Sequence, residues 1–199
     1  MKATLIALFT LTVFSTLSFV QAEEAQTLLD LVKDRNQTIE SIVSSPTEGE
    51  TPEERAEIKR IVSELFDFAS FSEVSLGRYW KDRTDAEKVE FTDLCRRLIE
   101  RNYANPALYK KAENVEYDGA SVDGDTGEVR TIVSYKTEKS TIYYQLKKVG
   151  DRWLIYDMEI DDLSIAKNNR SQFRKEIRKT SYEGLVKKLK DKLAKESEG

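Results

Sequence analysis

Acidic side chains gather at one point of the sequence, where Asp157, Glu159, Asp161 and Asp162 lie within six residues. Carboxylates can act as general acids and bases, or can bind calcium through oxygen. The spacing lacks the ligand pattern and the turn glycine of an EF-hand loop. Two interpretations stay open: a solvated strand end in which Asp157 bonds a neighbouring loop, or an enzyme that uses Asp157 or Glu159 in a cavity.

The chain contains no histidine and one cysteine, which excludes several classes of site. Ser-His-Asp triads, Cys-His dyads and histidine-held zinc or haem need a residue that is missing. Cys95 has no partner for an intramolecular disulfide, and we expect it to behave as a small buried apolar residue. We therefore predict no metal and no cofactor, and Asp and Glu are the only acid–base candidates that remain for an enzyme.

The charge balance argues against binding to nucleic acid. The 32 Lys and Arg residues are outnumbered by 36 Asp and Glu residues, which gives a formal net charge of −4. Proteins that bind nucleic acid normally carry a basic surplus on one face. Residues 170–199 are an exception, with ten basic against five acidic residues. This segment is either a solvated helical face or a surface that docks on acidic partners or anionic lipid headgroups.

The first 22 residues have the composition of a secretory signal peptide. Lys2 precedes an apolar stretch that ends at Val20, and Val20-Gln21-Ala22 fits the small-residue cleavage pattern. An uncleaved membrane anchor is the alternative. No later stretch of about 18 apolar residues occurs. We predict a signal peptide over residues 1–22 and a single exported domain over residues 23–199.

The order of the predicted elements indicates an α+β fold. Apolar residues recur at helical spacing over 25–45, and capping boxes at Thr51–Glu54 and Thr84–Glu87 begin two more helices. A corner is expected near Gly77, and Asn105-Pro106 ends the long helix. Strands are then predicted over 113–122, 128–136, 141–149 and 152–160, and helix returns over 168–195. Helices followed by an antiparallel meander and more helices are typical of α+β domains.

Several short motifs, taken in order, resemble one known family. Phe66-Asp67-Phe68, Leu76 to Trp80, Trp153 to Met158 and Asn169 to Phe173 are similar to segments of the MlaC family, the toluene-tolerance-type periplasmic phospholipid carriers. The resemblance covers residues 25–195. One departure is Asp162, because the family usually has glycine there, and this puts the local turn geometry in question.

The resemblance implies an NTF2-like curved antiparallel sheet whose N- and C-terminal helices enclose an apolar lipid cavity. It also implies a periplasmic carrier without catalytic activity whose cargo is phospholipid, and we expect a monomer. Its partners would be an outer-membrane lipoprotein–porin complex and an inner-membrane ABC transporter with an MCE-domain subunit, and its task would be to maintain outer-membrane lipid asymmetry. An NTF2-like enzyme and a non-lipid interaction or chaperone module are the competing hypotheses.

Strand alternation and helix spacing, applied to that cavity, give a set of predicted lipid contacts. From the helices they are Val74, Leu76, Phe91, Leu94, Leu98 and Tyr103. From the strands they are Ile132, Ile142, Tyr144, Leu146, Leu154, Tyr156, Met158 and Ile160. Lys187, Lys188 and Lys190, in the basic C-terminal segment, are the predicted docking residues.

Overall fold

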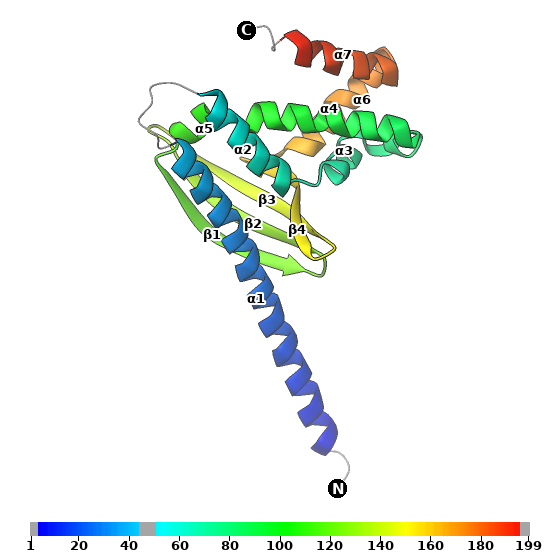
Figure 1. Ribbon diagram of the computed structural model, residues 1–199. Coiled ribbons are helices and arrows are strands. Elements are labelled where there is room, and N and C mark those ends of the chain that lie inside the picture. The colour runs from blue at the N-terminus through cyan, green and yellow to red at the C-terminus, as the bar shows by residue number, and fades with distance from the viewer. Residues whose placement is uncertain (1–3, 44–50, 196–199) are drawn as a thin grey trace.

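The computed structural model describes the backbone of residues 4–43 and 51–195, and the side chains from residue 21 onward within those ranges. Most of the predicted signal peptide and the polar loop predicted over residues 44–50 therefore lie outside the described side chains. The described chain forms an α+β fold, in which helices cover a curved antiparallel sheet (Figure 1).

The helices precede and follow the sheet in the predicted order. The elements are α1 (Thr4–Val43), α2 (Pro52–Leu65), α3 (Phe68–Leu76), the 3₁₀ helix η1 (Gly77–Trp80), α4 (Asp85–Tyr103), α5 (Pro106–Lys110), β1 (Asn114–Asp123), β2 (Thr126–Ser134), β3 (Lys139–Val149), β4 (Arg152–Ile160), β5 (Leu163–Ser164), α6 (Ile165–Lys179) and α7 (Tyr182–Lys195). The sequence did not predict the short elements α5 and β5.

Local signals explain where α2, α4 and α5 begin. The Thr51 side chain accepts from Glu54 N while the Glu54 carboxylate accepts from Thr51 N, which confirms the predicted capping box. Thr84 and Glu87 do the same for α4. Pro106 starts α5 directly after the Asn105 cap, so this proline ends one helical run and begins another.

The sheet is an antiparallel meander in the order β1-β2-β3-β4-β5. The β2–β3 register pairs Val129 with Tyr144 and Thr131 with Ile142, which places these four side chains on one face. Ile132 pairs with Thr141 and therefore points to the opposite face. Among the charged residues on that outer face, Arg130 bonds Asp118.

A β-bulge in β4 changes which of its residues share a face. Leu146 of β3 pairs with Ile155, and the adjacent Gln145 pairs with Asp157. Tyr156 therefore has no partner in β3 and is the extra residue of the bulge. Uninterrupted alternation predicted that Leu154 and Tyr156 point the same way as Met158 and Ile160. That prediction is wrong, because the bulge puts Ile155 on the face of Met158 and leaves Leu154 and Tyr156 on the other.

Helix α1 crosses the inner face of the sheet through a buried stripe formed by Leu28, Val32, Ile39 and Val43. Leu28 lies directly over Gly127, where an added Cβ would meet its Cδ1 at 2.3 Å. The glycine lets the helix approach β2 closely at this end of the sheet. Helix α1 and the sheet are in direct contact around Leu28, so the free space between them lies toward Ile39 and Val43.

A second part of the core joins α4, α6 and α7. The ring of Phe91 is fully buried, 5.8 Å from the ring of Phe173 and 6.2 Å from that of Tyr182. Leu94 and Leu98 follow on the same helix and are buried in this core. Among the described residues, no helix has both the length and the apolarity to cross a membrane.

Candidate functional site

A cavity of about 720 Å³ lies between the inner face of the sheet and helices α1, α2 and α5. This volume is typical of sites that hold one small organic molecule. The sheet contributes Val115, Tyr117, Val133, Ile142, Tyr144, Ile155, Met158 and Ile160, and the helices contribute Ile39, Val43, Val62, Leu65, Tyr103, Leu108 and Tyr109. Phe66 directly follows α2 and Tyr135 directly follows β2, and both also line the cavity.

Polar side chains occur where the cavity opens to solvent. The exposed residues Gln37, Glu40, Lys110, Glu113 and Asn114 belong to its lining. Lys110 Nζ also lies 3.1 Å from Oε2 of Glu54, so α5 is tied to the start of α2 at this opening. The cavity thus has an apolar interior and a charged, hydrated mouth, an arrangement that suits an amphiphile.

The phenol groups of the cavity are neutral at physiological pH. Burial raises the pKa of Tyr103 to about 12, and burial also raises the pKa values of Tyr109 and Tyr144. The Tyr109 hydroxyl donates to the Tyr103 carbonyl at 2.8 Å. These tyrosines therefore supply apolar ring surface rather than charge or a nucleophile.

The acidic cluster has a structural role in this fold. The carboxylate of Asp157 is buried and accepts hydrogen bonds from Met158 N, Ala166 N and the Ser164 hydroxyl, which fixes the beginning of α6 against β4. Asp157 and Glu159 do not belong to the cavity lining. Among the described residues, no group of three or more acidic, Cys or His side chains could hold a metal ion.

The turn after β4 explains how Asp162 can stand where the family resemblance predicts a glycine. Asp161 and Asp162 have φ values of 48° and 65°, in the left-handed region that favours glycine. Aspartate tolerates this region better than most residues. The Asp161 carboxylate accepts from Thr141 N at 2.8 Å and ties the turn to β3.

The structure brings five of the predicted lipid contacts together in the cavity: Tyr103, Ile142, Tyr144, Met158 and Ile160. They come from α4, β3 and β4. Leu146 shares their face of the sheet, but it is fully buried in the core instead of lining the cavity. Whether the five side chains contact a ligand remains a prediction.

The remaining predicted contacts lie elsewhere. Ile132, Leu154 and Tyr156 are on the outer face of the sheet, because of the β2–β3 register and the bulge in β4. Phe91, Leu94 and Leu98 point into the core between α4, α6 and α7, and Val74 and Leu76 lie on α3, beside α6. The apolar stripe of α4 faces other helices, so α1, α2 and α5 provide most of the helical lining.

Sequence reasoning missed most of the lining, which includes residues of α1, α2, α5, β1 and β2. Ile39 and Val43 belong to a helical stripe that the sequence does show, and Val133 and Tyr135 alternate with Thr131. These signals identify buried positions, but they do not distinguish a side chain that fills the core from one that borders a cavity.

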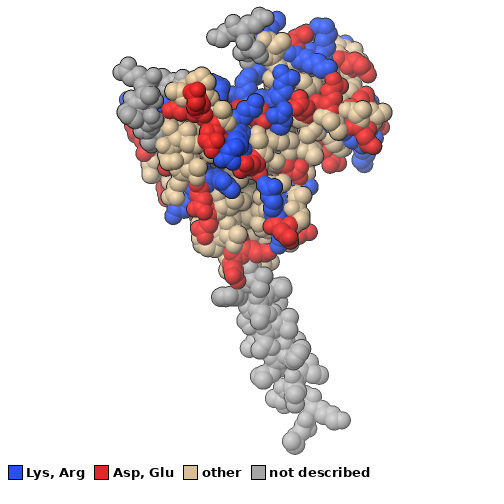
Figure 2. All heavy atoms as spheres, in the orientation of Figure 1, with Lys and Arg blue, Asp and Glu red and all other residues tan. Residues whose placement is uncertain are grey.

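The predicted docking lysines are exposed, and each pairs with a carboxylate of the same molecule. Lys187 Nζ lies 2.6 Å from Asp191 Oδ2, Lys190 Nζ lies 2.5 Å from Glu90 Oε1, and Lys188 pairs with Glu176. Figure 2 shows basic and acidic side chains interspersed over this face of the molecule. The α7 lysines therefore offer less free charge than the sequence suggests.

Comparisons with known proteins give one family match and one similar fold. The family model described as MlaC protein matches residues 33–191. A solved structure with a similar fold is a phospholipid-binding protein from Ralstonia solanacearum in complex with a phospholipid. It is 22% identical in sequence, with a TM-score of 0.69 over 88% of this chain and 98% of that one. No curated protein matches the sequence.

Proposed function

This chain belongs to the MlaC family, and on that basis we propose that it binds phospholipid in the cavity beneath α1 and carries it across the periplasm. The observation that carries the proposal is the cavity itself, whose interior is apolar and whose mouth is polar and exposed. The phospholipid bound by the Ralstonia protein, which shares the fold, supports the same ligand class.

The physical requirement for such a carrier is a balance with the membrane. Each methylene removed from water gains about 0.8 kcal/mol, so a lipid with about 30 methylenes gains on the order of 20 kcal/mol in any dry site. A bilayer offers nearly the same gain. A cavity lined by Val, Ile, Leu and neutral Tyr side chains can match the bilayer interior, while the open mouth leaves the headgroup hydrated.

The carrier role in our proposal extends to location and partners. Residues 1–22 would act as a signal peptide and residues 23–199 as one periplasmic domain. The protein would exchange phospholipid, as its cargo and not as a cofactor, between an outer-membrane lipoprotein–porin complex and an inner-membrane ABC transporter with an MCE-domain subunit. It would act as a monomer and maintain outer-membrane lipid asymmetry. We propose a binding protein rather than an enzyme, since Asp157 and Glu159 lie outside the cavity lining.

The direct test is native mass spectrometry of the full chain expressed with its own leader and purified without detergent. We expect a protein mass that starts at Glu23, carrying a stoichiometric phospholipid that chloroform extraction identifies. A ligand-free mass, together with no uptake of labelled phospholipid from vesicles, would refute lipid binding. A mass that retains residues 1–22 would refute only the cleaved leader.

Transport needs a separate measurement. The lipid-loaded protein should transfer labelled phospholipid to vesicles that contain the reconstituted inner-membrane complex faster than to vesicles without it. Equal rates to both kinds of vesicle would contradict the shuttle role and leave lipid binding intact.

A further inference from the structure

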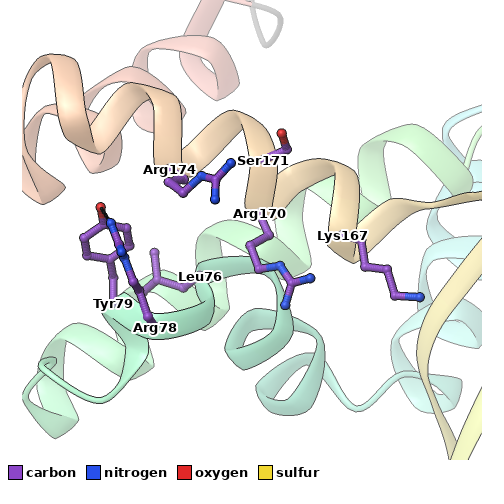
Figure 3. A pocket seen from close by; sticks show the side chains of 7 residues that line it. All are labelled: Leu76, Arg78, Tyr79, Lys167, Arg170, Ser171 and Arg174. Carbon is purple, nitrogen blue, oxygen red and sulfur yellow. Dashed lines mark hydrogen bonds between the residues drawn. The ribbon is translucent and has the colours of Figure 1, made fainter.

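A second cleft, of about 380 Å³, lies between η1 and α6 and is lined by basic side chains. The lining residues are Leu76, Arg78, Tyr79, Lys167, Arg170, Ser171 and Arg174. Figure 3 shows Arg170 extending from α6 toward α3, with Lys167 one helical turn before it. Arg174, one turn after Arg170, lies along α6 above Arg78 and Tyr79 in this view. We call Arg78, Lys167, Arg170 and Arg174 the basic cleft residues.

The charges of the basic cleft residues are not neutralised within the part of the chain that the structure describes. Among the described residues, no ion pair with a carboxylate involves any of the four, and all four are solvent-exposed. Arg78 donates to the Tyr79 hydroxyl at 3.0 Å, within the cleft lining. Four like charges around one concave surface create a positive potential that attracts anions. This concentration of positive charge in a concave lining favours an anionic ligand.

One of the four side chains is positioned by the backbone opposite it. Gly77 has a φ of +59°, and a Cβ added there would lie 2.7 Å from Cδ and 3.2 Å from Cγ of Arg170. The aliphatic stem of Arg170 therefore packs against the bare Cα of Gly77, at the corner between α3 and η1. This contact restricts the stem and leaves the guanidinium free to donate hydrogen bonds.

The chemistry of the cleft favours a phosphate group over a carboxylate. A guanidinium donates through a planar fork that matches the oxygens of either anion. A carboxylate has two oxygens and is satisfied by one fork, whereas a phosphate offers more oxygens and can bind more than one arginine at once. The cleft is also concave, which suits an inserted headgroup-sized anion better than a flat charged surface.

The cleft is distinct from the apolar cavity. The two share no lining residue, since the cavity is bordered by α1, α2, α5 and the sheet, and the cleft by α3, η1 and α6. A phospholipid whose tails fill the cavity would thus have its headgroup at the mouth near α5, away from Arg170.

We propose that the basic cleft is a second ligand site, which binds the phosphate group of a ligand through Arg78, Arg170 and Arg174. Two sources share this chemistry: the headgroup of a lipid in a membrane surface, and a soluble phosphate compound. The proposal does not depend on lipid binding in the cavity.

The test is calorimetric titration of the purified protein with inorganic phosphate at low ionic strength, because salt screens such contacts. The double variant Arg170→Gln/Arg174→Gln should weaken phosphate binding by about tenfold or more, since each guanidinium contributes a charge-assisted pair. The matched control is Arg178→Gln/Lys179→Gln. It removes two exposed charges from the same helix outside the cleft and should stay within about twofold of the parent protein.

A second arm separates the two sources. Vesicles of phosphatidylcholine with and without phosphatidylglycerol are mixed with the same three proteins and sedimented. Binding to the anionic vesicles that the cleft variant alone loses would support the headgroup as the source, and phosphate binding without vesicle binding would support a soluble one. No phosphate binding, or an equal loss of phosphate binding in the control variant, would overturn the proposal. All variants alter exposed side chains, and their circular dichroism spectra are compared with that of the parent protein to check folding.

Discussion

Ile142 offers a direct test of the cavity. It lines the cavity from β3 and is flanked in the sheet by Thr131 and Ile160. In Ile142→Glu, the carboxylate would lie among water molecules while the cavity is empty, so the protein should fold. A bound acyl chain would expel that water and leave the charge in apolar surroundings.

The expected loss of affinity follows from that desolvation. Removing an ion from water costs several kcal/mol in a real protein, and about 4 kcal/mol corresponds to a roughly thousandfold weaker complex. Ile132→Glu is the matched control, because the same substitution falls on the neighbouring strand and on the outer face of the sheet. Its side chain remains in contact with solvent whether or not the cavity is filled.

The assay is the amount of phospholipid that co-purifies with each variant in the absence of detergent, measured as phosphate per protein after extraction. We expect Ile142→Glu to be depleted and Ile132→Glu to match the parent protein, with equal circular dichroism spectra. Stoichiometric lipid in folded Ile142→Glu, or equal depletion in both variants, would show that the tails do not lie against the inner face of the sheet.

Three further predictions concern stability and transfer. Phe91→Ala should lower the free energy of unfolding by about 3–5 kcal/mol in denaturant titrations. The amount of lipid per folded molecule should not change, because Phe91 lies outside the cavity. A loss of lipid without a loss of stability would contradict this placement. Burial raises the pKa of Asp67, but hydrogen bonds from Ser70 and the charge of Lys147 outweigh it and hold the pKa below its usual value. The ionised Asp67 carboxylate therefore stabilises the fold above its ordinary pKa, and this stabilisation is lost as pH falls through the lowered pKa. The parent protein should lose more free energy of unfolding than Asp67→Asn between about pH 5 and pH 2. Equal losses in the two proteins over this pH range would contradict this prediction. Reversing Lys187, Lys188 and Lys190 to Glu should slow transfer to reconstituted membranes while lipid content stays intact, and an unchanged rate would remove α7 as a docking surface.

Variants of the basic cleft and of the α7 lysines distinguish phosphate binding from docking on partners. The α7 lysines are paired within the molecule, so their reversal changes local repulsion as well as surface charge. The basic cleft residues have no such pairs among the described residues. A transfer defect in the α7 triple variant but not in Arg170→Gln/Arg174→Gln would separate partner docking from phosphate binding.

Local sequence signals were enough to predict most of the elements and their order. Capping boxes at Thr51 and Thr84 act through hydrogen bonds three residues away, and helical or alternating apolar spacing reflects contacts along one element. Such local signals predicted α2, α4 and the four long strands closely. They also excluded histidine-based chemistry, since the chain has no histidine.

Which apolar residues border the cavity depends on how distant segments pack against one another. The extra residue at Tyr156 reverses the two faces of β4, and nothing local to that strand reveals where its partner skips a position. Phe91 and Ile142 are both apolar and regularly spaced, but one packs between helices while the other faces free space. A periodic pattern records that a side chain avoids water, and the packing of distant segments decides whether another side chain or a cavity lies opposite it.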